Sequence, residues 1–191
     1  MDTEKTDWFL RGNWAPLVEE KEVNDLKVDG SIPTELDGIY VRTGPNPKDG
    51  KGSHWFLGDG MVHGIRLKKG KAEWYRNRFV QTPDITEPLS DPMAGLGDLR
   101  RGKGNTHVVA HNEQIMCLEE AHWPWTINAD LETTGVLNYE GKLDCSMTAH
   151  PKVCPVTGEL LAFSYFSFDQ PYLKYIRVSA DGKLQQVEGI E

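Results

Sequence analysis

Histidines are the side chains in this sequence best suited to metal or acid–base chemistry, and there are six: His54, His63, His107, His111, His122 and His150. No HExxH segment occurs, which excludes the helix-borne zinc site that this motif builds. His107 and His111 lie four residues apart in a segment with the texture of a strand. At ~3.3 Å per residue their side chains would be about 13 Å apart on one face, too far to share a metal ion.

His150 differs from the other histidines because a proline follows it. Pro151 restricts the backbone of His150 to an extended conformation, and histidine is the commonest metal ligand at neutral pH. A strand-end histidine held in this way could direct its imidazole into a central cavity. The residues alone permit a metal ligand here without requiring one, and a structural role is the more common outcome for a lone histidine.

Other chemical motifs are missing from the sequence. There is no GxSxG segment, so neither Ser146 nor Ser164 has the setting of a hydrolase nucleophile. The glycine-rich stretch 58–64 (GDGMVHG) lacks the GxGxxG pattern and a following helix, which argues against a dinucleotide site. The cysteines are odd in number and form no CxxC pair, which argues against a disulfide framework or a zinc ribbon and favours a reducing, cytoplasmic location; they are Cys117, Cys145 and Cys154.

Composition excludes several function classes. The formal net charge of −8 makes nucleic acid an unexpected partner. No apolar run approaches the ~20 residues that cross a bilayer, and the polar, acidic N-terminus resembles neither a signal nor a transit peptide. With 191 residues, 38% of them hydrophobic, the chain is expected to form a single domain, 1–191. Membrane-surface contact is left open, because WPW (123–125) is too small a clue.

The elements that would position these side chains are predicted to be short strands. Residues 1–29 are expected to form an irregular leader. After Gly30, β-type runs alternate with glycine, proline, asparagine and aspartate, and the strand-rich segments are 38–44, 61–82, 106–120, 148–166 and 172–188. Segment 83–104 is a long loop, of a length that is usually functional or partly helical. We therefore predict an all-β fold of sequential antiparallel hairpins, which can form sandwiches, barrels or propellers.

Six segments in order resemble the carotenoid cleavage oxygenase family: 12–17 (GNWAPL), 30–47 (GSIPTELDGIYVRTGPNP), 54–67 (HWFLGDGMVHGIRL), 75–82 (YRNRFVQT), 105–124 (NTHVVAHNEQIMCLEEAHWP) and 149–165 (AHPKVCPVTGELLAFSY). The resemblance implies a seven-bladed β-propeller with Fe(2+) on its axis, held by four histidines. It also implies cleavage of an alkene double bond by O2, in an apolar polyene (a carotenoid or apocarotenoid) or a stilbene-like molecule.

The resemblance gives roles to two residues. His150 matches the first iron ligand, and Glu120 matches a glutamate that orients an iron-bound histidine. In the family these glutamates serve mainly the later histidines, so Glu120 could also be a simple strand-end charge. The other five histidines match no ligand position.

Three departures from the family pattern qualify this reading. Cys154 stands where the family usually has an aspartate that caps a turn. Glu119 replaces the lysine with which stilbene-cleaving members hold a phenol. Complete members are also more than twice as long as this chain, and their second histidine ligand is expected just beyond Glu191. We therefore expect an incomplete domain, inactive alone, that lacks three of the four iron ligands.

Blade length leads to the same expectation. At ~40–45 residues per blade, the chain would hold at most about four blades, with an exposed sheet edge and blade face. Two other functions stay open at this point: a non-catalytic binding or scaffold module, and retinoid isomerisation at the same iron site.

Overall fold

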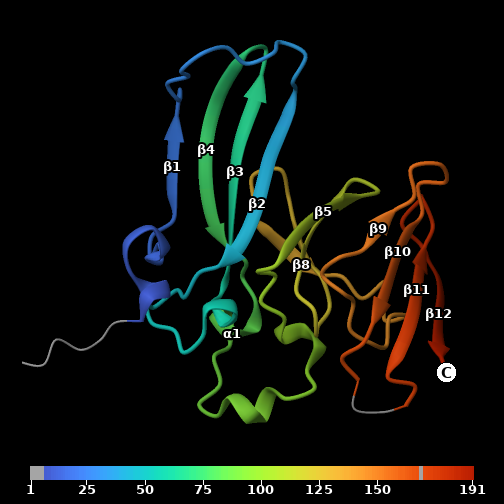
Figure 1. Ribbon diagram of the computed structural model, residues 1–191. Helices are drawn as coiled ribbons and strands as arrows, with labels where there is room; N and C mark the ends of the chain where they lie inside the picture. Colours follow the sequence, from blue (N-terminus) through green and yellow to red (C-terminus); the bar gives the residue numbers. More distant parts are fainter. Residues whose placement is uncertain (1–6, 168–169) are drawn as a thin grey trace, which may run out of the picture.

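The computed structural model describes residues 7–167 and 170–191, and these residues form three four-stranded antiparallel sheets (Figure 1). The first sheet has the order β1-β4-β3-β2 and contains β1 (Lys21–Asn24), β2 (Gly38–Pro45), β3 (Gly60–Lys68) and β4 (Lys71–Phe79). The second has the order β5-β6-β7-β8 and contains β5 (His107–His111), β6 (Gln114–Leu118), β7 (Trp125–Ile127) and β8 (Thr133–Val136). The third has the order β12-β11-β10-β9 and contains β9 (Lys152–Val153), β10 (Leu160–Ser164), β11 (Leu173–Val178) and β12 (Leu184–Ile190).

Each predicted hairpin is present, and its turn residues explain its position. The β3–β4 turn uses Lys69 and Gly70, both with positive φ, as the KKGK segment predicted. The β11–β12 turn uses Asp181-Gly182, where Gly182 has φ +78°. In the turn between β9 and β10, the sulfur of Cys154 accepts a hydrogen bond from the backbone N–H of Thr157 at 3.5 Å. The sulfur thus occupies the place of the missing aspartate as a weaker acceptor.

The expectation that residues 1–29 are irregular is wrong for one segment, because β1 pairs with β4. β1 is exposed along its whole length, so it has no apolar alternation that would identify it as a strand. Tertiary contacts hold it instead. The buried side chain of Asn77 accepts a hydrogen bond from Lys21 N at 2.6 Å, and Arg76 forms an ion pair with Glu22 at 3.0 Å.

Strands β7 and β8 were not predicted. β7 has only three residues, and the buried Trp125 and Ile127 flank the less buried Thr126. Such a short alternation gives little signal in a sequence. These two strands complete the second sheet, so each sheet has the four strands of a propeller blade.

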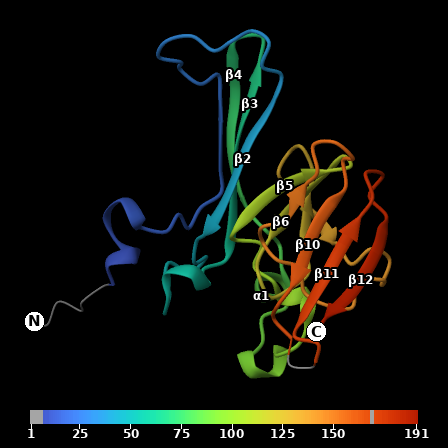
Figure 2. The same ribbon diagram turned by 45° about the vertical axis from the view of Figure 1, so that its right-hand side comes forward.

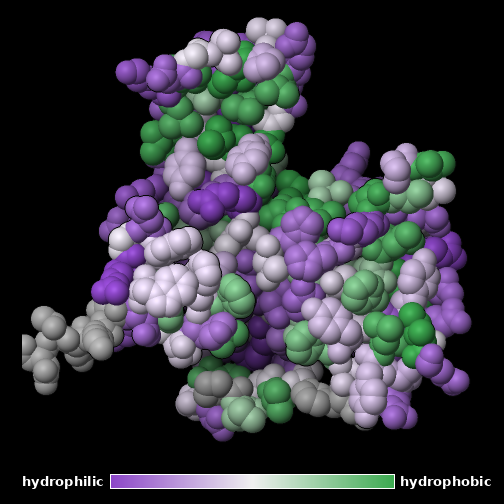
Figure 3. Space-filling model, in the orientation of Figure 1, coloured by the Kyte–Doolittle hydropathy of each residue, from purple (hydrophilic) through white to green (hydrophobic). Residues whose placement is uncertain are grey.

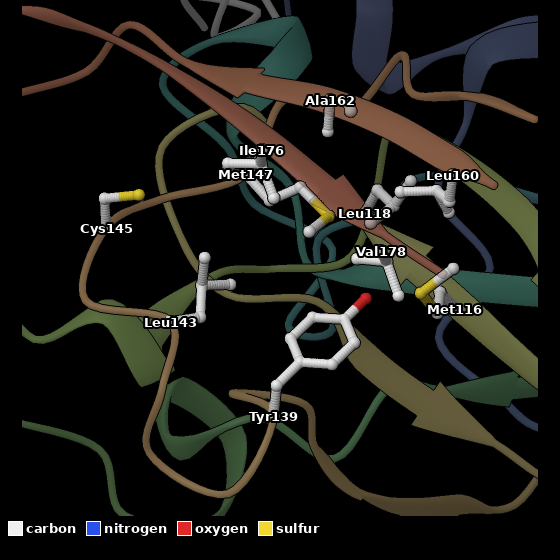
Figure 4. Packing of buried hydrophobic residues seen from close by; sticks show 11 residues of the cluster. Met116, Leu118, Tyr139, Leu143, Cys145, Met147, Leu160, Ala162, Ile176 and Val178 are labelled. Carbon is white, nitrogen blue, oxygen red and sulfur yellow. The ribbon is translucent and has the colours of Figure 1, made fainter. Parts of the chain in front are cut away.

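The second sheet packs between the other two. In β6, Met116 and Leu118 belong to a hydrophobic cluster shared with the third sheet, whereas Cys117 between them belongs to a cluster with Val62 and Val80 of the first-sheet region. Figure 4 shows the first cluster, in which Leu160, Ile176 and Val178 of β10 and β11 face Met116 and Leu118. Burying such a side chain fully stabilises a fold by ~1.5–3 kcal/mol.

Successive four-stranded sheets that pack face to face identify part of a β-propeller, and Figure 2 shows β5 and β6 beside β10, β11 and β12. The outward face of the third sheet remains exposed: Phe163, Leu173 and Ile190 are 45%, 37% and 48% exposed. The exposed blade face expected from the sequence is therefore present.

Segment 83–104 is partly helical, as its length suggested. It contains α1 (Pro83–Thr86) and the 3-10 turns η4 (Pro92–Gly95) and η5 (Leu99–Arg101). Two further turns, η1 (Trp8–Leu10) and η2 (Gly12–Trp14), pack their aromatic rings edge to face against Trp55 of η3 (Trp55–Leu57). Among the described residues, no helix is long and apolar enough to cross a membrane.

Candidate functional site

A cleft of about 920 Å³ opens between the end of β2, residues 55–59 before β3, segment 83–104 and the residues that follow β6. One part of its wall is apolar and consists of Trp55, Phe56, Leu57, Pro88, Leu89 and Leu96. The other part is polar and charged, and Figure 3 shows hydrophilic residues around a hollow near the centre of this face. A concave site with a large apolar wall and a few convergent polar groups is the usual form of a small-molecule site.

Ion pairs fix the polar wall. The ammonium of Lys103 lies 3.1 Å from Asp59 and 3.0 Å from Asp84, and Arg101 lies 3.1 Å from Asp84. Burial opposes the charge of Lys103, but the hydrogen bonds and charges of Asp84 and Asp59 outweigh it and raise the pKa of that ammonium. Segment 83–104 is thus tied to the start of β3. The side chain of Asn105 donates to Gly58 O at 2.7 Å and to Phe56 O at 3.0 Å, which holds the turn at the cleft's apolar wall.

Glu120 lines the cleft just beyond the end of β6. Its Oε2 accepts hydrogen bonds from the backbone N–H of Ala149 at 2.9 Å and from Thr148 Oγ1 at 3.1 Å. Burial alone would raise the pKa of Glu120, but these bonds, a bond from the Tyr165 hydroxyl and the charge of His150 together lower it. Burial and the bond to Glu120 raise the pKa of Tyr165 to about 12. Glu120 is therefore ionised and accepts hydrogen bonds from Ala149, Thr148 and Tyr165.

The other oxygen of Glu120 contacts His150. Glu120 Oε1 lies 3.0 Å from His150 Nε2, while the backbone N–H of His150 donates to Thr148 Oγ1 at 3.2 Å. The side chain of His150 is 60% exposed, so no enclosed cavity surrounds it. The structure thus brings together the two residues that the sequence singled out.

His107 also lies in this group, which the sequence did not predict. Its ring centroid is 5.9 Å from that of His150, and its Nδ1 bonds to Ala149 O at 2.7 Å. Since β5 and residue 149 are distant in the sequence, only the packing of the second sheet against the third reveals this proximity. The geometry leaves the role of His107 structural, since its hydrogen bond fixes the backbone next to His150.

Three other histidines hold local structure. His54 accepts a hydrogen bond from Phe56 N at 3.2 Å, and His111 bonds to Gly158 O at 2.9 Å through its Nε2. His63 bonds to the hydroxyl of Tyr75 at 2.9 Å, and burial, with a smaller effect of Arg42, lowers the pKa of its ring to about 4. Ser146 and Ser164 bond to each other at 2.7 Å in the interior.

A second acid–histidine pair lies in the cleft wall. The carboxylate of Glu119 pairs with Nδ1 of His122 and accepts a hydrogen bond from Ala121 N at 3.0 Å. Both side chains line the cleft, and they are 21% and 28% exposed. A spacing of three residues is typical of a pair on a helix, but residues 119–124 form no helix, so this spacing did not predict the pair.

The described residues do not by themselves form a metal site. Among them, no three or more histidine, cysteine, aspartate or glutamate side chains converge in a way that could hold a metal ion. Next to His150 Nε2, the donor set consists of one carboxylate oxygen of Glu120. Non-haem Fe(II) sites use at least three protein ligands, so one imidazole and one carboxylate do not suffice.

Comparison with known proteins identifies the family. The family model described as retinal pigment epithelial membrane protein matches residues 14–191. The chain is 39% identical to carotenoid 9,10(9',10')-cleavage dioxygenase 1 of Arabidopsis thaliana, over 91% of this chain and 38% of that protein. It is also 39% identical to a carotenoid cleavage oxygenase of Mycobacterium tuberculosis, over 96% of this chain and 38% of that protein.

A solved structure agrees with these matches. The lignostilbene dioxygenase of Pseudomonas brassicacearum superposes with a TM-score of 0.80 at 33% identity, over 94% of this chain and 41% of that one. The chain therefore spans about two fifths of the length of the relatives that it matches. Its three blades, and the match over almost all of its length, show that it belongs to the carotenoid cleavage oxygenase family.

Proposed function

We propose that this chain is the N-terminal part of a non-haem Fe(II)-dependent dioxygenase that uses O2 to cleave an alkene double bond. The substrate would be a carotenoid, an apocarotenoid or a stilbene-like molecule. Membership in the family supports this proposal, as do the relatives named as carotenoid and lignostilbene dioxygenases. The apolar wall of the cleft also supports it, because a polyene or a stilbene offers little else for a protein to bind.

The observation that carries the proposal is the position of Glu120. This carboxylate lines the cleft and also lies 3.0 Å from Nε2 of His150. The proposed ligand is thus next to the space that would hold the alkene. In this proposal His150 supplies one imidazole to the iron, and Glu120 orients a ligating ring. The apolar wall orients the substrate and excludes water.

From the same geometry we infer that the chain alone is inactive. The described residues offer one imidazole and one carboxylate at this position, and we infer that the remaining ligands come from polypeptide outside this sequence. A partial site of this kind should bind Fe(II) weakly and should not activate O2.

The first test is complementation. The chain is mixed with the C-terminal remainder of the lignostilbene dioxygenase, and iron content, O2 uptake and the carbonyl products of a stilbene and of an apocarotenoid are measured. We expect iron near one equivalent and O2 uptake only in the mixture. Stoichiometric iron in the isolated chain would contradict the single-imidazole reading.

The second test uses a complete protein that carries this sequence at its N-terminus. His150→Ala should remove most of the iron, whereas His111→Gln, a change at a histidine bound to a backbone carbonyl, should retain it. Iron retained by His150→Ala would overturn the ligand assignment. A complete protein without iron would indicate a non-catalytic scaffold, and an isomerised product without O2 uptake would indicate retinoid isomerisation.

A further inference from the structure

The Glu119–His122 pair has no part in the proposed function. Both residues lie in the cleft wall, within two residues of Glu120 in sequence, and they pair with each other, whereas His150 pairs with Glu120. An acid–histidine pair in the polar wall of a cleft that also has a large apolar wall needs a physical explanation, because exposing polar groups to an apolar ligand without hydrogen bonds has a cost.

The pair fixes which ring nitrogen carries the proton. An ionised carboxylate can only accept hydrogen bonds, so Nδ1 of His122 must donate to Glu119. In the neutral ring Nε2 is then unprotonated and can accept. Within the described part of the chain, this Nε2 has no hydrogen-bond partner.

The backbone also holds His122 in place. Ala121 N donates to the second oxygen of Glu119 at 3.0 Å, which fixes the carboxylate. The chain packs closely at Gly102, where an added Cβ would lie 2.5 Å from Cβ of His122. A glycine is therefore required there, because the backbone at Gly102 lies close to His122.

The cations of the cleft are not free to bind an anionic ligand, because carboxylates already pair with them. Lys103 is paired with Asp59 and Asp84, and Arg101 with Asp84 and Asp98. His122, with Nε2 as its acceptor, lines a cleft whose other wall consists of apolar side chains. Such a site fits a neutral hydrogen-bond donor carried by a hydrocarbon.

We propose that His122, oriented by Glu119, accepts a hydrogen bond from a hydroxyl group of the substrate and so selects hydroxyl-bearing polyenes over their ether or hydrocarbon counterparts. This inference rests on the proposed function and narrows its substrate class. The hydroxyl should add the free energy of one net hydrogen bond to the binding, which corresponds to a roughly five- to tenfold higher affinity.

The test compares two probes with the same chromophore and apolar body, all-trans-retinol and retinyl methyl ether. Their affinities for the 191-residue chain are measured by fluorescence titration. We expect retinol to bind roughly five- to tenfold more tightly than the ether. His122→Phe should abolish this preference, and circular dichroism of the variant checks that it is folded. Glu119→Gln should weaken the preference, and Glu113→Gln, at the exposed β5–β6 turn, should not change it.

Each outcome is informative. Equal affinity of the wild-type chain for both probes, or a preference that persists in His122→Phe, would overturn this inference and leave the proposed function standing. If neither probe binds, this inference is overturned as well, while the proposed function, which concerns the chain together with further polypeptide, is tested by the complementation experiment. An unchanged preference in Glu119→Gln would contradict the orienting role of Glu119.

Discussion

Glu120 Oε1 lies 3.0 Å from His150 Nε2, and the other oxygen of the same carboxylate accepts the backbone N–H of Ala149. One side chain thus fixes both the ring of His150 and the peptide that precedes it. The contact joins the end of β6 to the segment before β9, so it also links the second blade to the third.

Glu120→Leu should lower the free energy of unfolding by about 1–3 kcal/mol, because it leaves the Ala149 N–H and the Thr148 hydroxyl without their acceptor. Glu120→Gln keeps an oxygen acceptor and should cost less. Urea unfolding at pH 7 measures both effects, with the exposed Glu113→Gln as the control. Equal stability of Glu120→Leu and wild type would show that the carboxylate does not hold the 148–150 backbone.

His63 should make the fold sensitive to acid. Burial lowers the pKa of its ring from 6.5 to about 4 in the folded chain. Between these values the unfolded chain binds the proton and the folded chain does not, so stability is complete above pH 6.5 and falls as the pH drops towards 4. At about 1.4 kcal/mol per pKa unit the loss is at most ~3.5 kcal/mol, and less because the ring is partly exposed.

The measurement is urea unfolding of wild type and of His63→Gln at several values between pH 7 and pH 4. The difference between the two proteins should change over this window. A constant difference would mean that His63 titrates normally in the folded chain.

Lys103→Met should loosen segment 83–104. It removes the cation between Asp59 and Asp84 and leaves two partly buried carboxylates close together. We expect a loss of about 1–3 kcal/mol and faster proteolytic cleavage within 83–104. Lys142→Met, which breaks the exposed pair with Glu140, is the matched control and should change neither property. Cleavage at the wild-type rate in Lys103→Met would show that the ion pairs do not hold the segment.

Cys154→Asp should stabilise the β9–β10 turn. The sulfur of Cys154 accepts from Thr157 N only weakly at 3.5 Å, and a carboxylate at this position is a stronger acceptor for turn N–H groups. We expect a gain of about 0.5–1 kcal/mol, seen as a rise of ~1–4 °C in Tm. Cys154→Ala provides the baseline without any acceptor, and Cys154→Asp no more stable than this baseline would refute the capping explanation.

The sequence predicted the parts of the fold that local patterns specify. Hairpins such as β3–β4 and β11–β12 combine apolar alternation with glycine turns, so their positions were confirmed. β1 and β7 were not predicted, because β1 is fully exposed and β7 is only three residues long. Contacts with distant parts of the chain stabilise such strands; for β1, one of these contacts is the hydrogen bond from Lys21 N to the buried Asn77.

Local sequence patterns also predicted only part of the candidate site. His150 and Glu120 were singled out because short segments around them resemble a known family, and the structure places them in contact. The positions of His107 and His122 follow from how loops and sheets pack, which no local spacing reports. Whether His150 binds iron stays a prediction.

Strand β6 contributes to both hydrophobic clusters, since Cys117 belongs to one cluster while Met116 and Leu118 belong to the other. Local opening on either side must therefore disturb a strand on which the other side depends. Amide hydrogen exchange should find the slowest protons in β6, with a common opening free energy on its two flanks. The three blades should then unfold cooperatively as one unit, because β6 packs in both of the clusters that join them.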